Sequence, residues 1–199
     1  MTRSTFDSAP LVAVLAAGSA SRYGGGKLDA SCAGRPLGRW ALDAVAEAGL
    51  PPGVIVTAAA APQFARKAQG WTLIPNSRAD SGLASSLACA ARHATAQRAS
   101  ALLVLLADMP LVPARLLTDL VEAGAPAATT HPDGRPGVPA LLPACLFERL
   151  VSLQGDRGAA SLLTAEPNTR WLTAEPDWLL DVDTPEELAQ ADRLLRTRN

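Results

Sequence analysis

Short apolar runs alternate along this chain with longer segments of helical periodicity, and this alternation limits the possible folds more than any other feature. Runs rich in leucine, valine or alanine predict strands over residues 11–16, 54–58, 72–74, 101–106, 127–130 and 140–142. Helical spacing predicts helices over residues 37–48, 63–70, 83–99, 113–123 and 144–153, and a last helix that begins at Pro185. Strands that alternate with helices form parallel sheets covered on both faces. We therefore expect an α/β fold, a three-layer Rossmann-like sandwich with a mostly parallel sheet.

Length and composition favour one domain over residues 1–199. The 199 residues are ample for one hydrophobic core and few for two, and 48% of them are hydrophobic, which a disordered chain would not carry. The net charge of −1 gives no bulk attraction to nucleic acid or to an anionic membrane. We expect neither as a partner.

The three cysteines indicate a reducing compartment. They are odd in number, far apart and without C-x-x-C spacing, which argues against both a disulfide framework and a structural zinc site. The longest apolar runs, residues 11–17 and 101–107, are well short of the roughly 20 residues of a membrane helix. We expect a cytoplasmic location.

The loop after the first predicted strand has the composition of an anion-binding loop. In the expected fold, ligands bind beyond the carboxyl ends of the strands, so the residues after 11–16 and 101–106 matter most. Residues 15–27 read LAAGSASRYGGGK: Gly18 lets the backbone approach a phosphate, while Arg22 and Lys27 supply positive charge. A flexible connection would explain the glycines but not both cations. The loop matches neither a Walker motif nor a G-x-G-x-x-G fingerprint.

Aspartates follow the buried strand 101–106 and precede the last helix. Asp108 stands at the carboxyl rim, where it is a candidate ligand for Mg²⁺ or, alternatively, a turn or helix-cap residue. In an extended segment Asp181 and Asp183 point to one face with Val182 opposite, and two such carboxylates repel unless a cation is near. Asp183 is alternatively the cap of the helix that begins at Pro185.

Gly82 and Ser86 lie at the predicted start of the helix 83–99. Free N–H groups and the helix dipole there suit an anion or a base edge. The alternative is that Ser81 caps this helix with no ligand involved.

Four segments in order resemble the MobA-like NTP transferase family, in particular its molybdenum cofactor cytidylyltransferase (MocA-like) members. They are L-A-A-G-x-x-x-R-x-G-x-x-K at residues 15–27, Asn76 with SGLASSL at 81–87, LADMP at 106–110 and DVDTP at 181–185. A further stretch, QGDRGAA at 154–160, resembles the family's G-D-x-G-A-R segment. Ala107 stands where relatives usually carry glycine.

The resemblance implies a role for each matching residue. The implied nucleotide-binding residues are Leu15, Ala16, Ala17, Gly18, Ser19, Arg22, Lys27, Asn76, Gly82 and Ser86. The implied catalytic residues are Arg22, Lys27 and Asp108; Mg²⁺ would be held by Asp108 and Asp183, with Asp181 in support. Asp156 and Arg157 would bind the second substrate. Ala160 replaces the family's arginine there, which leaves Arg157 or Arg135 to hold an anionic pterin phosphate.

The implied function is transfer of a nucleoside monophosphate to the phosphate of molybdopterin or molybdenum cofactor, with release of pyrophosphate. Ala17 favours CTP because guanylyl relatives usually carry glycine there, and Asp181 and Asp183 favour it because those relatives often carry asparagine. A guanylyltransferase that uses GTP is one alternative, and sugar-1-phosphate or methylerythritol phosphate transfer is another. A non-catalytic chaperone that delivers the cofactor to a molybdenum hydroxylase is a third. Transient contact with such a hydroxylase is expected for the enzyme too.

Overall fold

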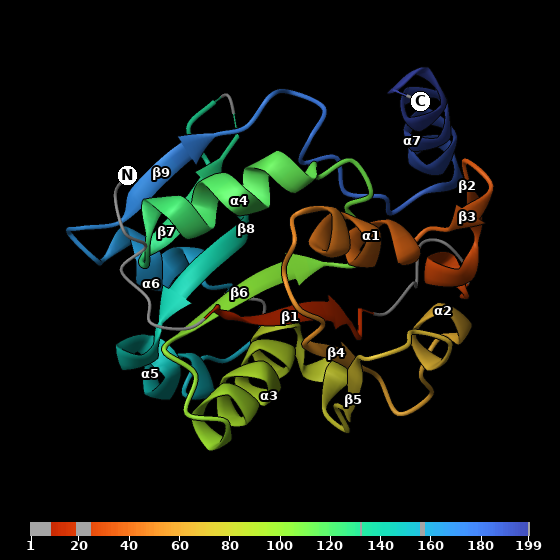
Figure 1. Cartoon of the computed structure of the whole chain (residues 1–199). Coiled ribbons are helices and arrows are strands. Elements are labelled where there is room, and N and C mark those ends of the chain that lie inside the picture. The colour runs from red at the N-terminus through yellow and green to blue at the C-terminus, as the bar shows by residue number, and fades with distance from the viewer. Residues whose placement is uncertain (1–8, 19–24, 132, 156–157, 199) are drawn as a thin grey trace.

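A seven-stranded mixed sheet forms the centre of the molecule. The computed structural model describes residues 9–18, 25–131, 133–155 and 158–198. In these residues the strands lie in the order β5-β4-β1-β6-β8-β7-β9 (Figure 1). Their bounds are β1 Leu11–Ala16, β4 Val54–Thr57, β5 Thr72–Pro75, β6 Ala101–Leu106, β7 Ala127–Thr130, β8 Pro136–Pro143 and β9 Arg170–Thr173. Only β8 runs antiparallel to its neighbours in this sheet, which confirms the predicted α/β class with a mostly parallel sheet.

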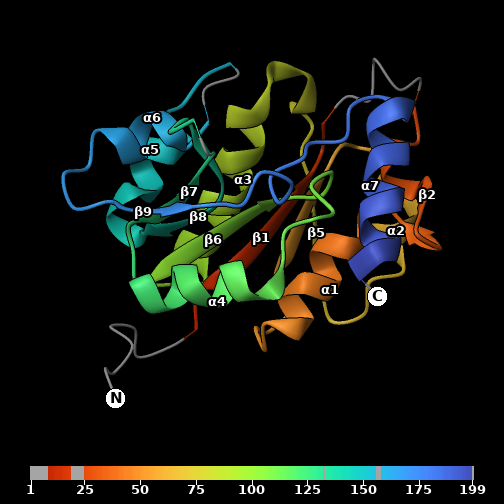
Figure 2. The ribbon, with the colours of Figure 1, turned by 90° about the horizontal axis from the view of Figure 1, so that it is seen from above.

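Helices cover both faces of the sheet (Figure 2). One face carries α1 (Arg39–Glu47) and α4 (Ala114–Ala123), and the other carries α3 (Leu83–Ala96), α5 (Phe147–Val151) and α6 (Ala160–Thr164). Successive residues of β1 face opposite layers: Val12 and Val14 pack with α1 and α4, while Ala13 and Leu15 pack with α3 and α5. No helix in the described ranges is both long and apolar enough to cross a membrane.

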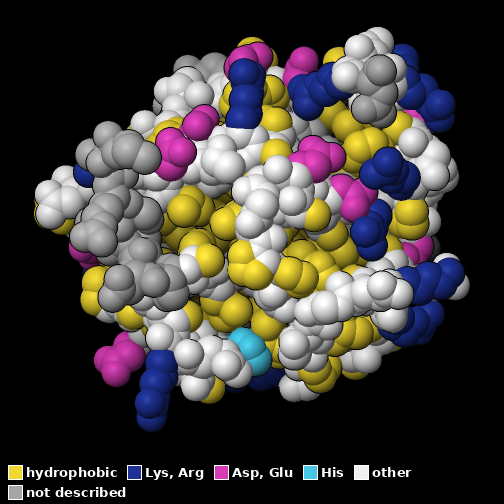
Figure 3. All heavy atoms as spheres, in the orientation of Figure 1, with side chains coloured by type: hydrophobic (Ala, Val, Ile, Leu, Met, Phe, Trp, Pro, Cys, Tyr) yellow, Lys and Arg dark blue, Asp and Glu magenta, His cyan; other side chains and the backbone are white. Residues whose placement is uncertain are grey.

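The last helix, α7 (Pro185–Arg198), lies beside the sheet and packs on the short hairpin of β2 (Ser31–Cys32) and β3 (Arg35–Pro36). Ala191 and Leu195 of α7 are buried and pack with Cys32 of the hairpin. Many basic side chains on the face shown in Figure 3 gather on this side of the molecule. Several are paired: Arg35 and Arg39 with Asp43, and Arg196 with Asp192.

The structure departs from the prediction in both halves of the chain. β8 is longer than predicted and antiparallel because only residues 131–135 separate it from β7, too few for a crossover. Pro136 and Pro139, which lack a backbone N–H, interrupt the apolar strand pattern at the start of β8. The hairpin, α6 and β9 were not predicted, and neither were the 3₁₀ turns η1 (Lys27–Asp29), η2 (Ala79–Ser81) and η3 (Ala144–Leu146). The remaining helix, α2 (Gln63–Arg66), is shorter than predicted.

Candidate active site

The carboxyl ends of β1 and β6 meet in the middle of the sheet, where the order of strands reverses. After β1 the chain adds β4 and β5 on one side and then β6 on the other. Ligands of open α/β sheets bind at such a switch point. Two clefts of about 250 and 260 Å³ open there, and Leu15, Gly18 and Asp108 line both of them.

Predicted nucleotide-binding residues from separate segments line these two clefts. The first cleft also contains Ala16 and Lys27, and the second contains Ala17, Gly82 and Ser86. A Cβ atom placed on Gly18 would meet no heavy atom of the described residues within 4 Å. The structure thus brings the start of the predicted loop and the start of α3 to one edge of the sheet.

Three carboxylates meet at the same edge. Each of Asp108, Asp181 and Asp183 offers an oxygen, and these oxygens lie within 4.8 Å of one another. The backbone carbonyl of Asp108 accepts a 3.0 Å hydrogen bond from the N–H of Val182, which holds segment 181–183 beside the end of β6. Val182 is fully buried, so the two flanking aspartates share the opposite face, as the alternation predicts. Clustered carboxylate oxygens are the ligands that Mg²⁺ and Mn²⁺ prefer, so these residues fit a divalent cation.

The pKa of Asp181 reflects this crowding. Burial of the carboxyl among protein atoms, followed by the negative charges of Asp108 and Asp183, raises the pKa to about 7. The residue as a whole still has a large exposed surface, so the desolvation concerns the carboxyl end that faces the cluster. Ionising all three carboxylates without a further cation is therefore unfavourable.

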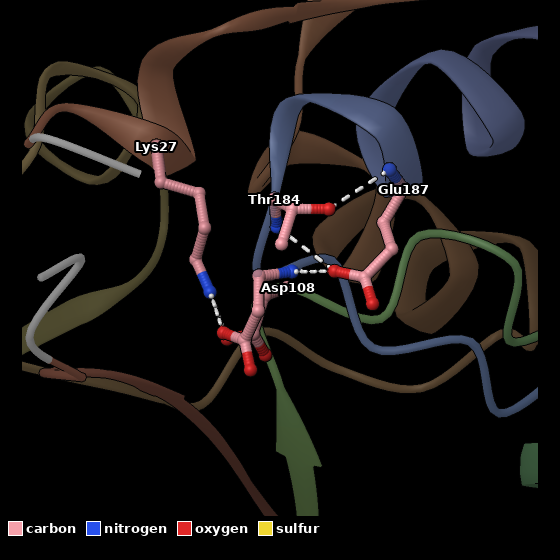
Figure 4. Close-up of polar contacts among 5 residues, drawn as sticks. Lys27, Asp108, Thr184 and Glu187 are labelled. Carbon is pink, nitrogen blue, oxygen red and sulfur yellow. Dashed lines mark hydrogen bonds and ion pairs between the residues drawn. The ribbon is translucent and has the colours of Figure 1, made fainter. Parts of the chain in front are cut away.

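Lys27 supplies a positive charge to this cluster (Figure 4). Its ammonium nitrogen lies 2.9 Å from Asp108 Oδ2 and 2.9 Å from Asp183 Oδ1, and its side chain is only 8% exposed. Burial by itself lowers the pKa of Lys27, but the charge of Asp108 and the hydrogen bonds to both carboxylates outweigh burial, so the pKa lies above its usual value. Lys27 therefore stays protonated in this position.

The turn that carries Lys27 is anchored to α2. Asp29 accepts hydrogen bonds of 2.7 Å from the N–H groups of both Gln63 and Phe64, which are the first residues of α2. Gly26, just before Lys27, has a φ of 67°, a left-handed conformation that favours glycine. The sequence did not indicate this role for Asp29, because its partners lie 34 and 35 residues further along the chain.

A reciprocal cap fixes the backbone next to Asp183 (Figure 4). Glu187 Oε2 accepts hydrogen bonds from the N–H groups of Asp183 and Thr184, at 2.7 and 2.8 Å, and its own N–H donates to Thr184 Oγ1. This is a capping box with Thr184 as the cap, so the alternative in which Asp183 caps α7 is wrong. The T-x-x-E spacing was present in the sequence and could have revealed it.

Asn76 ties the end of β5 to the start of α3. It is 3% exposed, and its side-chain amide donates to Ser85 Oγ and Ser86 Oγ at 2.8 and 3.1 Å. Ser85 Oγ donates in turn to the carbonyl of Gly82. Gly82, with a φ of 91°, occupies the cap position of α3 that the alternative gave to Ser81. Asn76 therefore shapes the second cleft through the two serines.

Part of the predicted site lies outside the described residues, namely Ser19, Arg22, Asp156 and Arg157. Beside the last two, Gly158 and Ala160 line a third cleft of about 250 Å³, whose lining has no charged side chain in the described part of the chain. Arg135, the other predicted partner of an acceptor phosphate, is exposed and donates to Asp133.

Comparison with known proteins agrees with this geometry. The model of the MobA-like NTP transferase domain family matches residues 12–170. No curated protein has significant sequence similarity to the chain.

Solved structures with the same fold cover almost the whole chain. The structure of Rv0371c from Mycobacterium tuberculosis H37Rv is 26% identical, with a TM-score of 0.75 over 94% of this chain and 98% of that one. A complex of Rv0371c with manganese matches at 22% identity, with a TM-score of 0.70 over 93% and 98%. Molybdopterin-guanine dinucleotide biosynthesis protein A from Archaeoglobus fulgidus is 21% identical, with a TM-score of 0.66 over 94% and 98%.

Proposed function

The chain belongs to the family of MobA-like NTP transferase domains, and on this basis we propose that it transfers CMP from CTP to the phosphate of molybdopterin or molybdenum cofactor. Residues 1–199 would form one nucleotidyltransferase domain. The observation that carries the proposal is the cluster of Asp108, Asp181 and Asp183, whose oxygens lie within 4.8 Å of one another at the edge where Gly18 and Lys27 line the first cleft. An NTP needs such a combination of carboxylates for a metal ion and cations for phosphates.

The proposed reaction is an in-line displacement at phosphorus. An oxygen of the acceptor phosphate forms a bond to the α-phosphorus of CTP, and the bond from that phosphorus to the bridging oxygen breaks. Pyrophosphate leaves with the electron pair. Because the attacking oxygen is already anionic, the site needs positioning and charge neutralisation rather than a general base.

Different residues of the chain would bind the metal ion, neutralise the phosphates and position the nucleotide. Asp108 and Asp183 would hold Mg²⁺, with Asp181 in support, and the bound ion would withdraw charge from the α-phosphate. The manganese complex of Rv0371c supports a divalent metal in a protein of the same fold. Arg22 and Lys27 would stabilise the leaving pyrophosphate, and residues 15–19 would place backbone N–H groups along the nucleotide. Asn76 would act through the serines that it holds at the start of α3.

The proposed acceptor is a molybdopterin-type cofactor. The name of the Archaeoglobus fulgidus protein supports this class, together with the resemblance of residues 154–160. Asp156 and Arg157 would contact the acceptor. The product would then pass to a molybdenum hydroxylase in a transient contact.

Ala17 supports CTP over GTP. It is 5% exposed and lines the second cleft with Gly82 and Ser86, where its methyl group takes space beside a bound base. A pyrimidine tolerates that methyl group better than a purine does. One methyl group is worth ~1–3 kcal/mol of discrimination in such a site.

The test is kcat/KM for CTP, GTP, ATP and UTP with molybdenum cofactor and Mg²⁺. We expect CTP to be preferred by roughly tenfold or more, and Ala17→Gly to reduce that preference. Equal or higher values for GTP would identify a guanylyltransferase instead. Tight binding of the cofactor without turnover of any nucleotide would identify a cofactor-binding chaperone.

A further inference from the structure

The ammonium group of Lys27 lies against the carboxylate cluster, while the residue also lines the first cleft. Its ammonium group contacts Asp108 and Asp183, the two residues with which a divalent cation would be held, at 2.9 Å each. The contacts join residues that are 81 and 156 positions apart, so they depend on the tertiary fold and not on local sequence. Within the described ranges Lys27 is the only charged residue that is buried, at 7% exposed.

This placement makes Lys27 and a divalent cation competitors. The ammonium group already neutralises one charge of the cluster and uses one oxygen of each carboxylate. A second cation beside it would meet electrostatic repulsion in a site that is partly shielded from water, where charges interact more strongly than in bulk solvent. A metal ion alone therefore has to displace the lysine, which would cost the ammonium group its two charge-assisted hydrogen bonds to Asp108 and Asp183.

A nucleotide offers the displaced lysine new partners. Lys27 also lines the first cleft with Gly18, Gly25 and Gly26, where the phosphates would lie. Its flexible four-carbon stem can redirect the ammonium group while Asp29 keeps the backbone turn attached to α2. Phosphate oxygens would then replace Asp108 and Asp183 as acceptors, and the carboxylates would become available to the metal ion.

We propose that Lys27, besides contacting the phosphates of the bound nucleotide, stands in for the metal ion in the nucleotide-free protein and makes metal binding conditional on the nucleotide. The inference rests on the proposed function in that it takes the nucleotide as the ligand that draws Lys27 away. In the absence of nucleotide the lysine holds Asp108 and Asp183 together and keeps divalent cations out. Metal and nucleotide thus bind together, which ties the charge needed for catalysis to the presence of the substrate.

The first measurement uses Mn²⁺ alone, without nucleotide. The affinity of the full chain for Mn²⁺ is followed by the electron paramagnetic resonance signal of the free ion. We expect Lys27→Met to bind Mn²⁺ roughly tenfold tighter than wild type or more, a typical size for coupling between two ligands. Lys67→Met is the matched control, because Lys67 is the only other lysine, is exposed, and should leave the affinity unchanged.

A second variant keeps the test decisive if Lys27→Met does not fold. Lys27→Gln keeps a hydrogen-bond donor for the carboxylates but removes the charge, and it should also tighten Mn²⁺ binding. Far-ultraviolet circular dichroism confirms which variant is folded at the temperature used. Equal or weaker Mn²⁺ binding by a folded Lys27 variant, compared with wild type, would overturn the proposal.

The third arm adds CTP and corrects for the Mn²⁺ that CTP binds in solution. Wild type should then gain Mn²⁺ affinity by several-fold more than Lys27→Met does. An equal gain in both proteins would show that the lysine does not respond to the nucleotide, and the proposal would fail. If no nucleotide binds at all, the proposed function and the conditional step both fail, but tighter Mn²⁺ binding by Lys27→Met would still establish the competition.

Discussion

The negative charges of Asp108 and Asp183 act on both Lys27 and Asp181. They favour the charged form of Lys27 and the neutral form of Asp181. The carboxylates of Asp108 and Asp183 attract the ammonium group of Lys27 strongly enough to outweigh its burial. The same two carboxylates repel a charge on Asp181, and its burial acts in the same direction. One cation is therefore not enough for three ionised carboxylates, and the protonated form of Asp181 is favoured in the metal-free protein. A divalent cation would replace both that proton and the lysine.

The raised pKa of Asp181 predicts how the stability of the metal-free protein depends on pH. The folded-state pKa of about 7 lies above the ordinary value of 3.8, so the folded state binds the proton more tightly than the unfolded state. The stabilising contribution is fully present below about pH 4 and is lost as the pH rises through 7. In EDTA, the melting temperature of wild type should therefore fall relative to that of Asp181→Asn between pH 4 and pH 8.

Mn²⁺ provides the control for this prediction. At pH 8 Mn²⁺ together with CTP should raise the melting temperature of wild type more than that of Asp181→Asn, because the variant lacks a carboxylate whose negative charge the metal ion would neutralise. A difference between the two proteins that stays constant from pH 4 to pH 8 would show that Asp181 ionises normally.

Motifs in the sequence located some of these residues, but not the contacts that orient them. Asp108, Lys27 and Asp183 belong to recognisable motifs, and their meeting at one edge follows from the order of strands. The hydrogen bonds of Asp29 with the start of α2 could not be predicted, because the loop residues concerned carry no periodic pattern. The same holds for the contact of Asn76 with Ser85.

The start of α7 links helix stability to the carboxylate cluster. Glu187 accepts the N–H groups of Asp183 and Thr184, so the first turn of the helix fixes the backbone that presents Asp183. The preceding residue, Val182, is also fixed, because it is buried and its N–H donates to the carbonyl of Asp108. Asp183 therefore approaches Asp108 on a segment held at two neighbouring points.

Removing the cap should weaken both the fold and the metal site. Thr184→Ala is expected to lower the free energy of unfolding by about 1 kcal/mol, as measured in urea. Glu187→Ala should have a similar effect and should also weaken binding of Mn²⁺ in the presence of nucleotide, because Asp183 loses its backbone partner. Glu186→Ala is the control, since Glu186 is exposed and forms no part of the cap. Unchanged stability in both cap variants would rule out this role of the capping box.

Predictability from sequence varied with the burial and length of an element. β1 and β6 are continuous apolar runs in the middle of the sheet, and their bounds were predicted to the residue. β9 was missed because three of its four residues are exposed and it lies at an edge, so it shows little apolar pattern. β2 and β3 have two residues each, too few for any periodicity, and only pairing with each other defines them.

In the whole molecule, the candidate active site lies at the edge of the sheet that separates the two main apolar clusters. Alternate residues of β1 and β6 belong to the apolar clusters on opposite faces of the sheet, so both strands are held from two sides. A third apolar cluster joins α7 to the β2–β3 hairpin and includes Val182. The N–H of Val182 donates to the carbonyl of Asp108, just after β6. A rigid pair of strands thus carries one side of the site, and the segments around Lys27 and Asp183 form the other.

Transfer of the α-phosphorus tests the proposed function most directly. The chain is incubated with Mg²⁺, molybdenum cofactor and CTP that carries a radioactive α-phosphorus, and the label is followed into the cofactor. We expect wild type to transfer the label with release of unlabelled pyrophosphate, and Asp108→Asn to do so roughly 100-fold more slowly or worse while keeping its fold. Absence of label in the cofactor with wild type, or near wild-type transfer by Asp108→Asn in saturating Mg²⁺, would contradict the account.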